Sequence, residues 1–360
     1  MLLHVTTPLV RTRPSNAIFV TCGGCGPACQ KRAAMIESAR TIRVISAHKL
    51  RELVSMADAI DAIGETFKQM ADAKMEQIPR TSLPDGSLLT MVAHGRGSSG
   101  TSVKVIGIRQ DPDHHDWPLL SALVLWFDHG SGQPVAVIEG SQLTALRTGA
   151  ASGVATDLLA APDASGLAMI GSGAQAGDQI LAVCTVRQIE VVRIFSRNAE
   201  SAARLAYRLS QSSPGIEFRV CPDLRSATRD SDVICTATTA TSPLIHGGDL
   251  KERVHINAVG AYRPDMCEIS SEVIAAAWVV AVDHLEAAQA EAGDLLQAAS
   301  AGRFAMDDAV ELGALLRRPR PRSTGWTIFK SVGISAQDWA IARLAVERSY
   351  GMEVPNISLK

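Results

Sequence analysis

A glycine-rich turn between a strand and a helix constrains the fold of this chain more than any other feature. The nearly all-apolar run Gly166–Ile170 leads directly into Gly171-Ser172-Gly173-Ala174-Gln175-Ala176, and an apolar helical run follows from Asp178 to Val186. A GxGxxA sequence alone is a weak signal, but between a strand and a helix it is typical of a βαβ unit that binds a dinucleotide. An ordinary glycine turn is the alternative, and this context disfavours it.

Each position in the turn has its own expected role. Gly171 permits the tight bend, Gly173 lets the backbone approach a pyrophosphate, and Ala176 allows the helix to pack closely on the strand. The free N–H groups at the start of the helix, which Ala174 and Gln175 lead into, are expected to face the phosphates. These five residues form the first part of a predicted cofactor site.

The chain after Pro162 alternates short apolar strands with helical runs or short loops. Such strands are typical of a parallel sheet that is buried on both faces. The sequence therefore predicts an α/β fold with a Rossmann-type dinucleotide-binding domain in this part of the chain. Its strands are expected at Gly166–Ile170, Glu190–Phe195, Glu217–Val220, Asp232–Cys235, His255–Val259 and Trp278–Val282.

The second of these strands ends in Phe195-Ser196-Arg197-Asn198. NAD-dependent enzymes usually carry an acidic residue at this point, about 20 residues beyond the glycines, where it binds the ribose hydroxyls. Ser196, Arg197 and Asn198 instead offer a hydroxyl, a guanidinium and an amide, which suit a 2′-phosphate. We therefore expect these three residues to contact the cofactor, and NADP(H) is favoured over NAD(H).

The part of the chain from Ile42 to Leu159 has a different pattern. Apolar residues from Leu50 to Met70 recur at three- and four-residue steps, which predicts one long amphipathic helix. Four strand-like runs follow and predict a largely antiparallel sheet that this helix covers. A further helix is expected at Gln142–Leu159. The strands are expected at Leu88–Ala93, Thr101–Ile108, Leu119–Phe127 and Val135–Glu139.

The end of the chain is expected to return to this first, α+β domain. The segment Arg317–Arg322 is polar and interrupted by prolines, which is typical of a linker. Thr327–Val332 and a helix over Ala336–Tyr350 then follow. The sequence thus predicts one discontinuous domain, residues 41–147 plus 326–360, around an inserted dinucleotide-binding domain, residues 148–325.

Charge and hydropathy exclude several classes of partner. The 35 basic and 37 acidic side chains leave a net charge of −2 without a long block of one sign, so the electrostatic field of a nucleic-acid binder is missing. The most apolar stretch, Val273–Val282, is well short of the roughly 20 residues that span a bilayer. The N-terminus does not read as a secretory signal, so a cytoplasmic location is expected. A small molecule is the expected partner.

Residues 1–40 differ from the rest and are expected to be a disordered extension. They contain Cys22, Cys25 and Cys29, a spacing compatible with a metal, but a fourth ligand is missing nearby. The loop from Asp111 to Asp116 contains two histidines and three aspartates, and it is predicted to be a solvated turn. No metal site is predicted.

Three basic residues stand in unusual settings within the first 150 positions. Arg80 follows Pro79 at an expected strand start, Lys104 lies in a strand between two valines, and Arg147 lies on a helix. Surface exposure is the ordinary expectation for each of them taken singly. Strand alternation leaves the burial of Lys104 undecided.

At these residues the chain resembles the ornithine cyclodeaminase/mu-crystallin family, over about residues 42–350. The resemblance implies a homodimer in which the first domain binds the substrate and dimerises, while the Rossmann domain is inserted into it. The matching segments are QIPR at 77–80, VKVIG at 103–107, DHGSGQPVAVIEG at 128–140, LTALRTGAAS at 143–152, GSGAQA at 171–176, HINAVGAYRPDMCEI at 255–269 and TIFKSVGISAQD at 327–338.

The resemblance also implies roles for single residues. Arg80 and Arg147 are similar to the pair that clamps the substrate α-carboxylate, a task that suits planar guanidinium groups. Lys104 is similar to the family's lysine near the carboxylate or the reacting nitrogen, where a lowered pKa would let it exchange a proton as the catalytic residue. The residues expected to complete the cofactor site are Thr236, Val259, Gly260 and Ser331.

One departure from the family concerns Tyr262. It stands where ornithine cyclodeaminases carry a catalytic aspartate, and a phenol supplies no carboxylate at neutral pH. The segment GAYRPD looks more like the ketimine reductase/mu-crystallin branch, so Tyr262 is expected in the substrate site of a reductase. Asp265 could compensate, but its expected role is to cap the turn after Pro264.

The expected function is NAD(P)H-dependent reduction of a cyclic imino acid, such as pyrroline-2-carboxylate or piperideine-2-carboxylate, to proline or pipecolate. The arginines would position the imine carbon for hydride transfer. Three alternatives stay open: ornithine cyclodeamination to proline and ammonia, an alanine-dehydrogenase-like reaction on an open-chain substrate, and a non-catalytic NADPH-dependent ligand carrier. An amino or imino acid with an α-carboxylate is the expected small-molecule partner.

Overall fold

The computed structural model describes residues 41–111, 118–320 and 324–358. The predicted extension with Cys22, Cys25 and Cys29 lies outside these ranges, as does most of the loop from Asp111 to Asp116. Within the described ranges, every helix is too short or too polar to span a bilayer.

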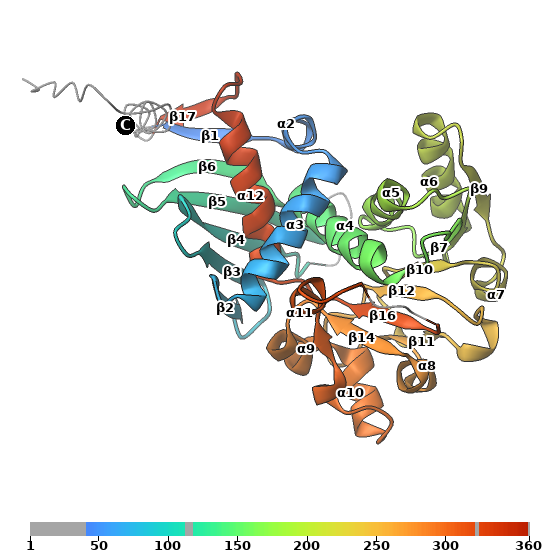
Figure 1. Cartoon of the computed structure of the whole chain (residues 1–360). Helices are drawn as coiled ribbons and strands as arrows, with labels where there is room; N and C mark the ends of the chain where they lie inside the picture. The colour runs from blue at the N-terminus through green and yellow to red at the C-terminus, as the bar shows by residue number, and fades with distance from the viewer. Residues whose placement is uncertain (1–40, 112–117, 321–323, 359–360) are drawn as a thin grey trace, which may run out of the picture. The chain divides into compact units, whose positions relative to one another are not determined.

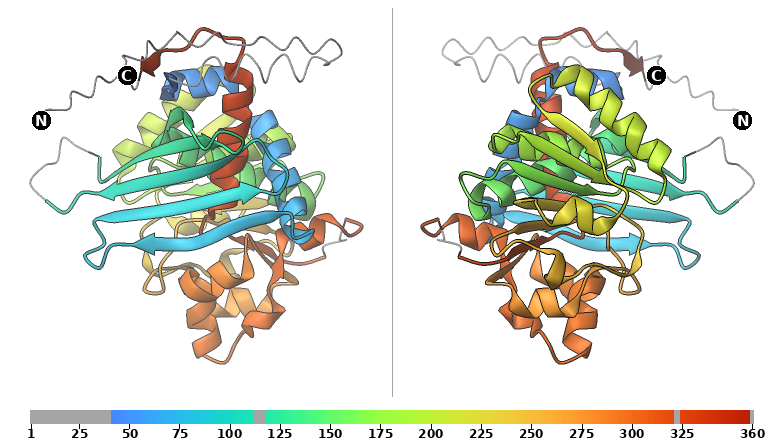
Figure 2. Two further views of the ribbon diagram at one scale, coloured as in Figure 1. Left: turned by 90° about the vertical axis from the view of Figure 1, so that its left-hand side faces the viewer. Right: turned by 90° about the vertical axis from the view of Figure 1, so that its right-hand side faces the viewer.

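The first sheet has seven strands in the order β17-β1-β6-β5-β4-β3-β2. Strands β3 to β6 pair antiparallel with one another, as predicted, and β2 adds a further antiparallel strand beside β3. Strand β1 pairs parallel with β6. Figure 1 shows helix α12 lying across one face of this sheet, and the left view of Figure 2 presents the opposite face. The strands are β1 (Thr41–Ile45), β2 (Met75–Ser82), β3 (Leu88–Gly95), β4 (Gly100–Ile108), β5 (Leu120–Asp128), β6 (Pro134–Glu139) and β17 (Asn356–Ser358).

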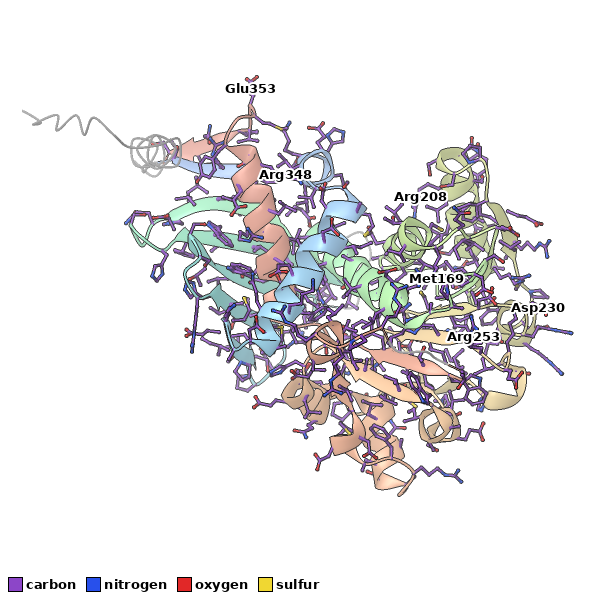
Figure 3. The ribbon with its side chains drawn as sticks, viewed as in Figure 1. Met169, Arg208, Asp230, Arg253, Arg348 and Glu353 are labelled. Atoms are coloured by element: carbon purple, nitrogen blue, oxygen red, sulfur yellow. The ribbon has the colours of Figure 1, made fainter. Side chains whose placement is uncertain are left out.

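The second sheet has eight parallel strands in the order β15-β14-β16-β12-β10-β7-β8-β9. Its central strands are buried on both faces, as Met169 of β7 illustrates (Figure 3), which confirms the predicted α/β fold with a parallel sheet. The strands are β7 (Gly166–Ile170), β8 (Val191–Phe195), β9 (Glu217–Val220), β10 (Val233–Thr236), β12 (His255–Ala258), β14 (Val279–Val282), β15 (Val310–Glu311) and β16 (Thr327–Lys330).

Short helices connect these strands, and a small two-stranded sheet lies beside them. The helices are α5 (Ala176–Val186), α6 (Ala199–Ser212), α7 (Leu224–Thr228), α8 (Ser271–Ala276), α9 (Leu285–Glu291), α10 (Gly293–Ser300) and α11 (Leu312–Leu316), with 3-10 turns η1 (Gly247–Asp249) and η2 (Met306–Asp308). The small sheet pairs β11 (Thr241–Ile245) with β13 (Cys267–Ile269).

The long helix predicted from Leu50 to Met70 is two helices, α2 (Ala47–Leu53) and α3 (Met56–Ala71). Ser55 explains the break: its hydroxyl accepts from the N–H of Asp58, and the Asp58 carboxylate accepts from the N–H of Ser55. This capping box starts a new helix inside the apolar pattern. The expectation that this helix covers the sheet was also wrong, because α12 (Ser335–Ser349) lies directly on β2 to β5 and α3 packs mainly on α4, α11 and α12.

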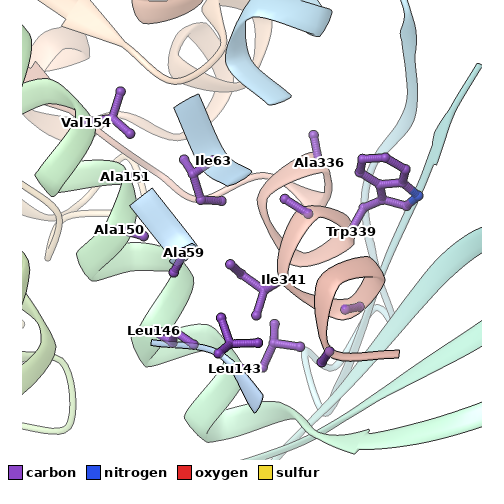
Figure 4. Close-up of a cluster of buried hydrophobic side chains, with 14 of the residues drawn as sticks. Ala59, Ile63, Leu143, Leu146, Ala150, Ala151, Val154, Ala336, Trp339 and Ile341 are labelled. Atoms are coloured by element: carbon purple, nitrogen blue, oxygen red, sulfur yellow. The ribbon is translucent and has the colours of Figure 1, made fainter. Parts of the chain in front are cut away.

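Helices α3, α4 (Gly140–Leu159) and α12 share one apolar core, shown in Figure 4. Ile63 of α3, Leu146 of α4 and Ile341 of α12 are fully buried at their common interface. Helix α5 packs on α4 from another side, so nearly all of α4 is buried. This packing carries Arg147 into the interior.

Two predicted boundaries differ from the observed elements. The strand Thr327–Lys330 was predicted in the first domain, but as β16 it pairs with β12 and β14 in the parallel sheet, and all four of its residues are buried. After β16 the chain returns to the first sheet with α12, which packs on it, and with β17, which pairs with β1. The boundary between residues 147 and 148 falls inside α4, which packs on both α3 and α5. The division into two domains itself stays a prediction.

Candidate active site

The carboxyl edge of the parallel sheet carries most of the predicted cofactor residues. Gly171 follows β7, Ser196 follows β8, Thr236 ends β10, Gly260 lies just after β12 and Ser331 follows β16. Parallel strands end at the same edge, so the topology brings these five positions to one side of the sheet. Open α/β sheets bind their ligands at this edge, at the point where the strand order reverses. In this sheet the order reverses at β7, because β8 lies on one side of it and β10 on the other.

A cavity of about 540 Å³ opens beside the glycine turn. Gly171 has a φ of +108°, and a Cβ there would collide with the carbonyl of Ala237, so the turn requires glycine. A Cβ at Gly173 would meet nothing within 4 Å, which leaves room for a ligand. Helix α5 starts after Gln175 without a side-chain cap, which leaves its first N–H groups for a phosphate. These features fit a dinucleotide.

The loop after β8 forms another wall of this cavity. Ser196, Arg197 and Asn198 line it together with Arg204 of α6. The hydroxyls of Ser172 and Ser196 are hydrogen-bonded at 2.9 Å, which ties the loop to the glycine turn. The Asn198 side chain also caps α6. Two guanidinium groups therefore border the cavity where the adenosine ribose of a dinucleotide is expected.

A buried carboxylate that the sequence analysis did not single out, Glu268, holds two of the cofactor segments together. It accepts hydrogen bonds from Thr236 Oγ1 at 2.9 Å, Thr238 N at 2.7 Å and Gly260 N at 2.8 Å. Val259, which directly precedes Gly260, donates its N–H to the carbonyl of Thr236. Glu268 thus fixes the ends of β10 and β12 relative to each other.

A second buried carboxylate, Asp283, fixes the turn after β16. Its Oδ2 accepts from Ser331 Oγ at 2.7 Å and from the N–H of Gly333 at 2.8 Å. Gly333 has a φ of +79°, and a Cβ there would overlap the guanidinium of Arg147. The carbonyls of Val332 and Gly333 accept from Arg80 Nη2 at 3.1 and 3.0 Å. The turn therefore lies against both arginines of the predicted carboxylate clamp.

A buried ion cluster occupies the space between the first sheet and α12. Lys104 Nζ lies 2.8 and 2.7 Å from the two carboxylate oxygens of Asp338. Arg147 Nε lies 3.3 Å from Asp338 Oδ1, and Arg147 Nη1 donates to Gln337 Oε1 at 2.5 Å. The side chains of Lys104 and Asp338 are each 1% exposed. In this interior one carboxylate faces two cations, and Lys104 is on the inner face of β4.

Arg80 reaches this region because of an irregularity in β2. The pairing with β3 shifts between Ile78 and Thr81, so Pro79 and Arg80 together oppose the single residue Met91. Such a bulge re-aims the side chains that follow it. Arg80 is therefore half-buried within β2, and the expectation that it stands at a strand start was wrong.

Arg80 also lines a second cavity, of about 320 Å³. Its Nη1 lies 3.4 Å from Glu291 Oε2 of α9, and Glu286 of the same helix lines the cavity too. The apolar side chains Ile78, Met91, Ala287, Ala290 and Ile334 complete much of the wall. The cavity therefore combines one arginine, an acidic wall and an apolar surface.

Burial and neighbouring charges perturb the titration of this cluster. Burial lowers the pKa of Lys104 to about 8; Asp338 acts against this shift, and Arg147 adds to it. Burial also lowers the pKa of Arg147, and it raises the pKa of Glu291. Lys104 therefore titrates close to neutral pH, as a group that exchanges protons during a reaction should.

The structure thus brings Arg80, Lys104 and Arg147 together. Tyr262 packs against the buried apolar cluster of the parallel region, with the Arg263 guanidinium carbon 6.0 Å from its ring centroid. Its place in a substrate site stays a prediction. Five further residues that the sequence did not reveal contact the predicted site residues directly: Glu268, Asp283, Glu291, Gln337 and Asp338.

Comparison with known proteins identifies the family. Residues 41–353 match the ornithine cyclodeaminase/mu-crystallin family. The chain is 35% identical to a Delta(1)-pyrroline-2-carboxylate reductase of Bacillus cereus over 321 residues, 87% of this chain and 98% of the relative. It is 32% identical to the mouse ketimine reductase mu-crystallin over 322 residues, 88% of this chain and 98% of the relative.

A solved structure agrees with these relatives. The Delta(1)-pyrroline-2-carboxylate reductase of Thermococcus litoralis, in complex with NADH and L-proline, is similar with a TM-score of 0.82 and 31% identity, over 88% of this chain and 100% of that one. The chain belongs to the ornithine cyclodeaminase/mu-crystallin family.

Proposed function

We propose that this protein is an NAD(P)-dependent oxidoreductase acting on C–N bonds that reduces cyclic imino acids. Its substrates are pyrroline-2-carboxylate or piperideine-2-carboxylate, and its products are proline or pipecolate. The observation that carries the proposal is that Arg147 and Arg80 meet at the Ser331–Gly333 turn, at the carboxyl edge of the dinucleotide-binding sheet, while Asp338 joins Lys104 to Arg147. The similarity to pyrroline-2-carboxylate and ketimine reductases supports it.

Each group has a task in this reaction. The glycine turn and the segments that Glu268 joins would hold a nicotinamide dinucleotide, which would supply the hydride. Arg147 and Arg80 bind the substrate carboxylate and so fix the imine carbon in place. The Lys104 ammonium gives its proton to the imine nitrogen as the carbon accepts the hydride, which yields the amine, and water then returns a proton to Lys104.

The cavity beside Arg80 supports a substrate with a single carboxylate. Glu291 and Glu286 line its wall, so a second carboxylate on the substrate would face two acidic groups. The apolar side chains opposite them suit the methylene groups of a five- or six-membered ring. Tyr262 stands in the sequence where ornithine cyclodeaminases carry a catalytic aspartate, and its phenol supplies no carboxylate at neutral pH. This supports a reductase over an ornithine cyclodeaminase.

Two assays test this function. The first follows NADPH or NADH oxidation with each cyclic imino acid and with pyruvate plus ammonia. The second measures ammonia release from ornithine in the presence of NAD⁺. The highest kcat/KM is expected for a cyclic imino acid. Ammonia and proline formed from ornithine would instead identify a cyclodeaminase. NADPH binding without turnover of any substrate would identify a ligand carrier.

The cofactor preference proposed here is NADP(H). Arg197 and Arg204 both line the cavity at the end of β8, where two cations suit a 2′-phosphate. Replacing Arg197 by alanine is expected to lower kcat/KM for NADPH by about tenfold, one lost charge-assisted hydrogen bond, while that for NADH changes little. Steady-state kinetics with both cofactors measure this. Equal losses for NADPH and NADH, or a wild-type preference for NADH, would contradict the assignment.

A homodimer and a cytoplasmic location complete the proposal. The first sheet exposes Leu88 and Leu123, which strand alternation puts on the face opposite Lys104, and a second copy of the sheet would cover them. The cysteines among the described residues are free thiols, and both these and the reduced dinucleotide suit the cytoplasm.

A further inference from the structure

Asp338 is a buried carboxylate that takes no direct part in the proposed reaction. It lies in the first turn of α12, is 1% exposed, and contacts two of the three basic residues of the site. Its neighbour Gln337 holds Arg147 Nη1. Burying a carboxylate this deeply costs folding free energy unless the charge is paired and hydrogen-bonded.

The charged groups facing Lys104 come from three elements. Asp338 of α12 lies 2.7 Å from it, Arg147 of α4 shares the same carboxylate, and Arg80 of β2 adds a second guanidinium nearby. Thr144 Oγ1 lies 3.4 Å from Lys104 Nζ. Asp338 is thus the single negative charge among these partners. Without it, burial and two arginines would all favour the neutral amine.

We propose that Asp338 is a positioning residue that keeps Lys104 in its ammonium form at neutral pH and fixes Lys104 and Arg147 in one geometry. This inference rests on the proposed function, because the ammonium is the proton source for the imine nitrogen. Asp338 itself touches neither substrate nor cofactor in this assignment; it acts through Lys104. Substrate binding and the proton supply then depend on one carboxylate.

The pH profile of the reduction tests this role. In the wild type, kcat is expected to fall above pH 8, where Lys104 loses its proton. In Asp338→Asn, this fall is expected at least one pH unit lower, so that kcat drops tenfold or more at pH 8 and only a few-fold at pH 6. Asp338→Glu keeps the negative charge and should restore most of the wild-type profile. A merely structural role would instead lower kcat equally at all pH values.

A matched control loosens the same helix at its other end. Arg348 of α12, labelled in Figure 3, pairs with Asp58 of α3 at 2.7 Å. Asp58→Asn removes that ion pair without touching the site, so its pH profile should coincide with that of the wild type. A shifted profile in Asp58→Asn, or an unshifted one in Asp338→Asn, would overturn the proposal.

A second measurement does not require turnover. In protein labelled with ¹³C at lysine Cε, the resonance that is absent from Lys104→Met reports the titration of Lys104 directly. It should titrate near pH 8 in the wild type and at least one unit lower in Asp338→Asn. If this shift occurs in a protein that reduces no imino acid, the role of Asp338 stands and the proposed function fails. An unchanged titration refutes the role of Asp338.

Discussion

Two lysines among the described residues are fully buried, and each pairs with an aspartate from another element. Lys330 Nζ at the end of β16 lies 2.6 Å from Asp294 Oδ2, and Lys104 Nζ lies 2.7 Å from Asp338 Oδ2. The other oxygen of Asp294 accepts two backbone N–H groups, from Glu268 and Ile269. The other oxygen of Asp338 contacts both Lys104 and Arg147. The same pair of residue types therefore has two different surroundings.

We infer that this difference separates a structural ion pair from one that takes part in the proposed reaction. Asp294 joins β16 to the start of β13 through backbone contacts, so its pair with Lys330 ties fixed parts of the fold together. Asp338 pairs with two cations, Lys104 and Arg147, beside the Ser331–Gly333 turn. The positive charge of Arg147 opposes the stabilisation of the Lys104 ammonium by Asp338, so the proton on Lys104 is more easily lost. Both lysines are buried, so we base the proposed catalytic role of Lys104 on the two guanidinium groups near it rather than on its burial.

Removing Lys104 should have the largest effect on catalysis. Lys104→Met keeps the volume of the side chain but lacks the proton, so kcat for imine reduction is expected to fall by about 10² to 10⁴, the usual contribution of a general acid. Asp338 retains Arg147 as a partner, so the loss of stability should be modest. Kinetics and urea unfolding measure the two effects. A kcat within tenfold of the wild type would remove Lys104 from the mechanism.

Removing Lys330 should reverse this pattern. Lys330→Met leaves Asp294 buried without its cation, and breaking such a pair typically costs about 3 to 5 kcal/mol in the free energy of unfolding. The kcat of the folded protein is expected to change less than tenfold, because Lys330 supplies no proton. Urea unfolding and kinetics on the same preparation check this. A large loss of kcat with unchanged stability would show that the two lysines do not differ as argued.

The same contrast explains how much could be predicted from the sequence. The glycine turn, the parallel strands and the three basic residues have local signals, and the strand Gly166–Ile170 is observed with the predicted bounds. The break at Ser55 was missed because the apolar periodicity runs through it, although Ser55 and Asp58 carry a capping signal. The four-residue strand β16 was assigned to the wrong sheet because a short apolar run does not reveal its pairing partners.

The positioning acids could not be inferred in the same way. Asp338 closes the segment TIFKSVGISAQD, but an aspartate in the first turn of a helix is usually read as a partner of the helix dipole. Its contact with Lys104 joins residues 234 positions apart, and Glu268 acts on segments up to 32 positions away. Such contacts follow from the tertiary fold. The sequence alone therefore located the basic groups but not the acids that hold them.

The smallest expected effect is the pH dependence of stability that Lys104 contributes. In the unfolded chain a lysine titrates near its ordinary pKa of about 10.4, whereas Lys104 in the fold titrates near pH 8. Between these values the unfolded chain holds a proton that the native protein lacks, so stability rises with pH. The wild type should therefore gain stability relative to Lys104→Met by at most about 1.4 kcal/mol per pH unit between pH 8 and 10. Urea unfolding of both proteins across this range measures the slope. A parallel pair of curves would mean that Lys104 keeps its ordinary pKa, and the distinction between the two buried lysines would then rest on geometry alone.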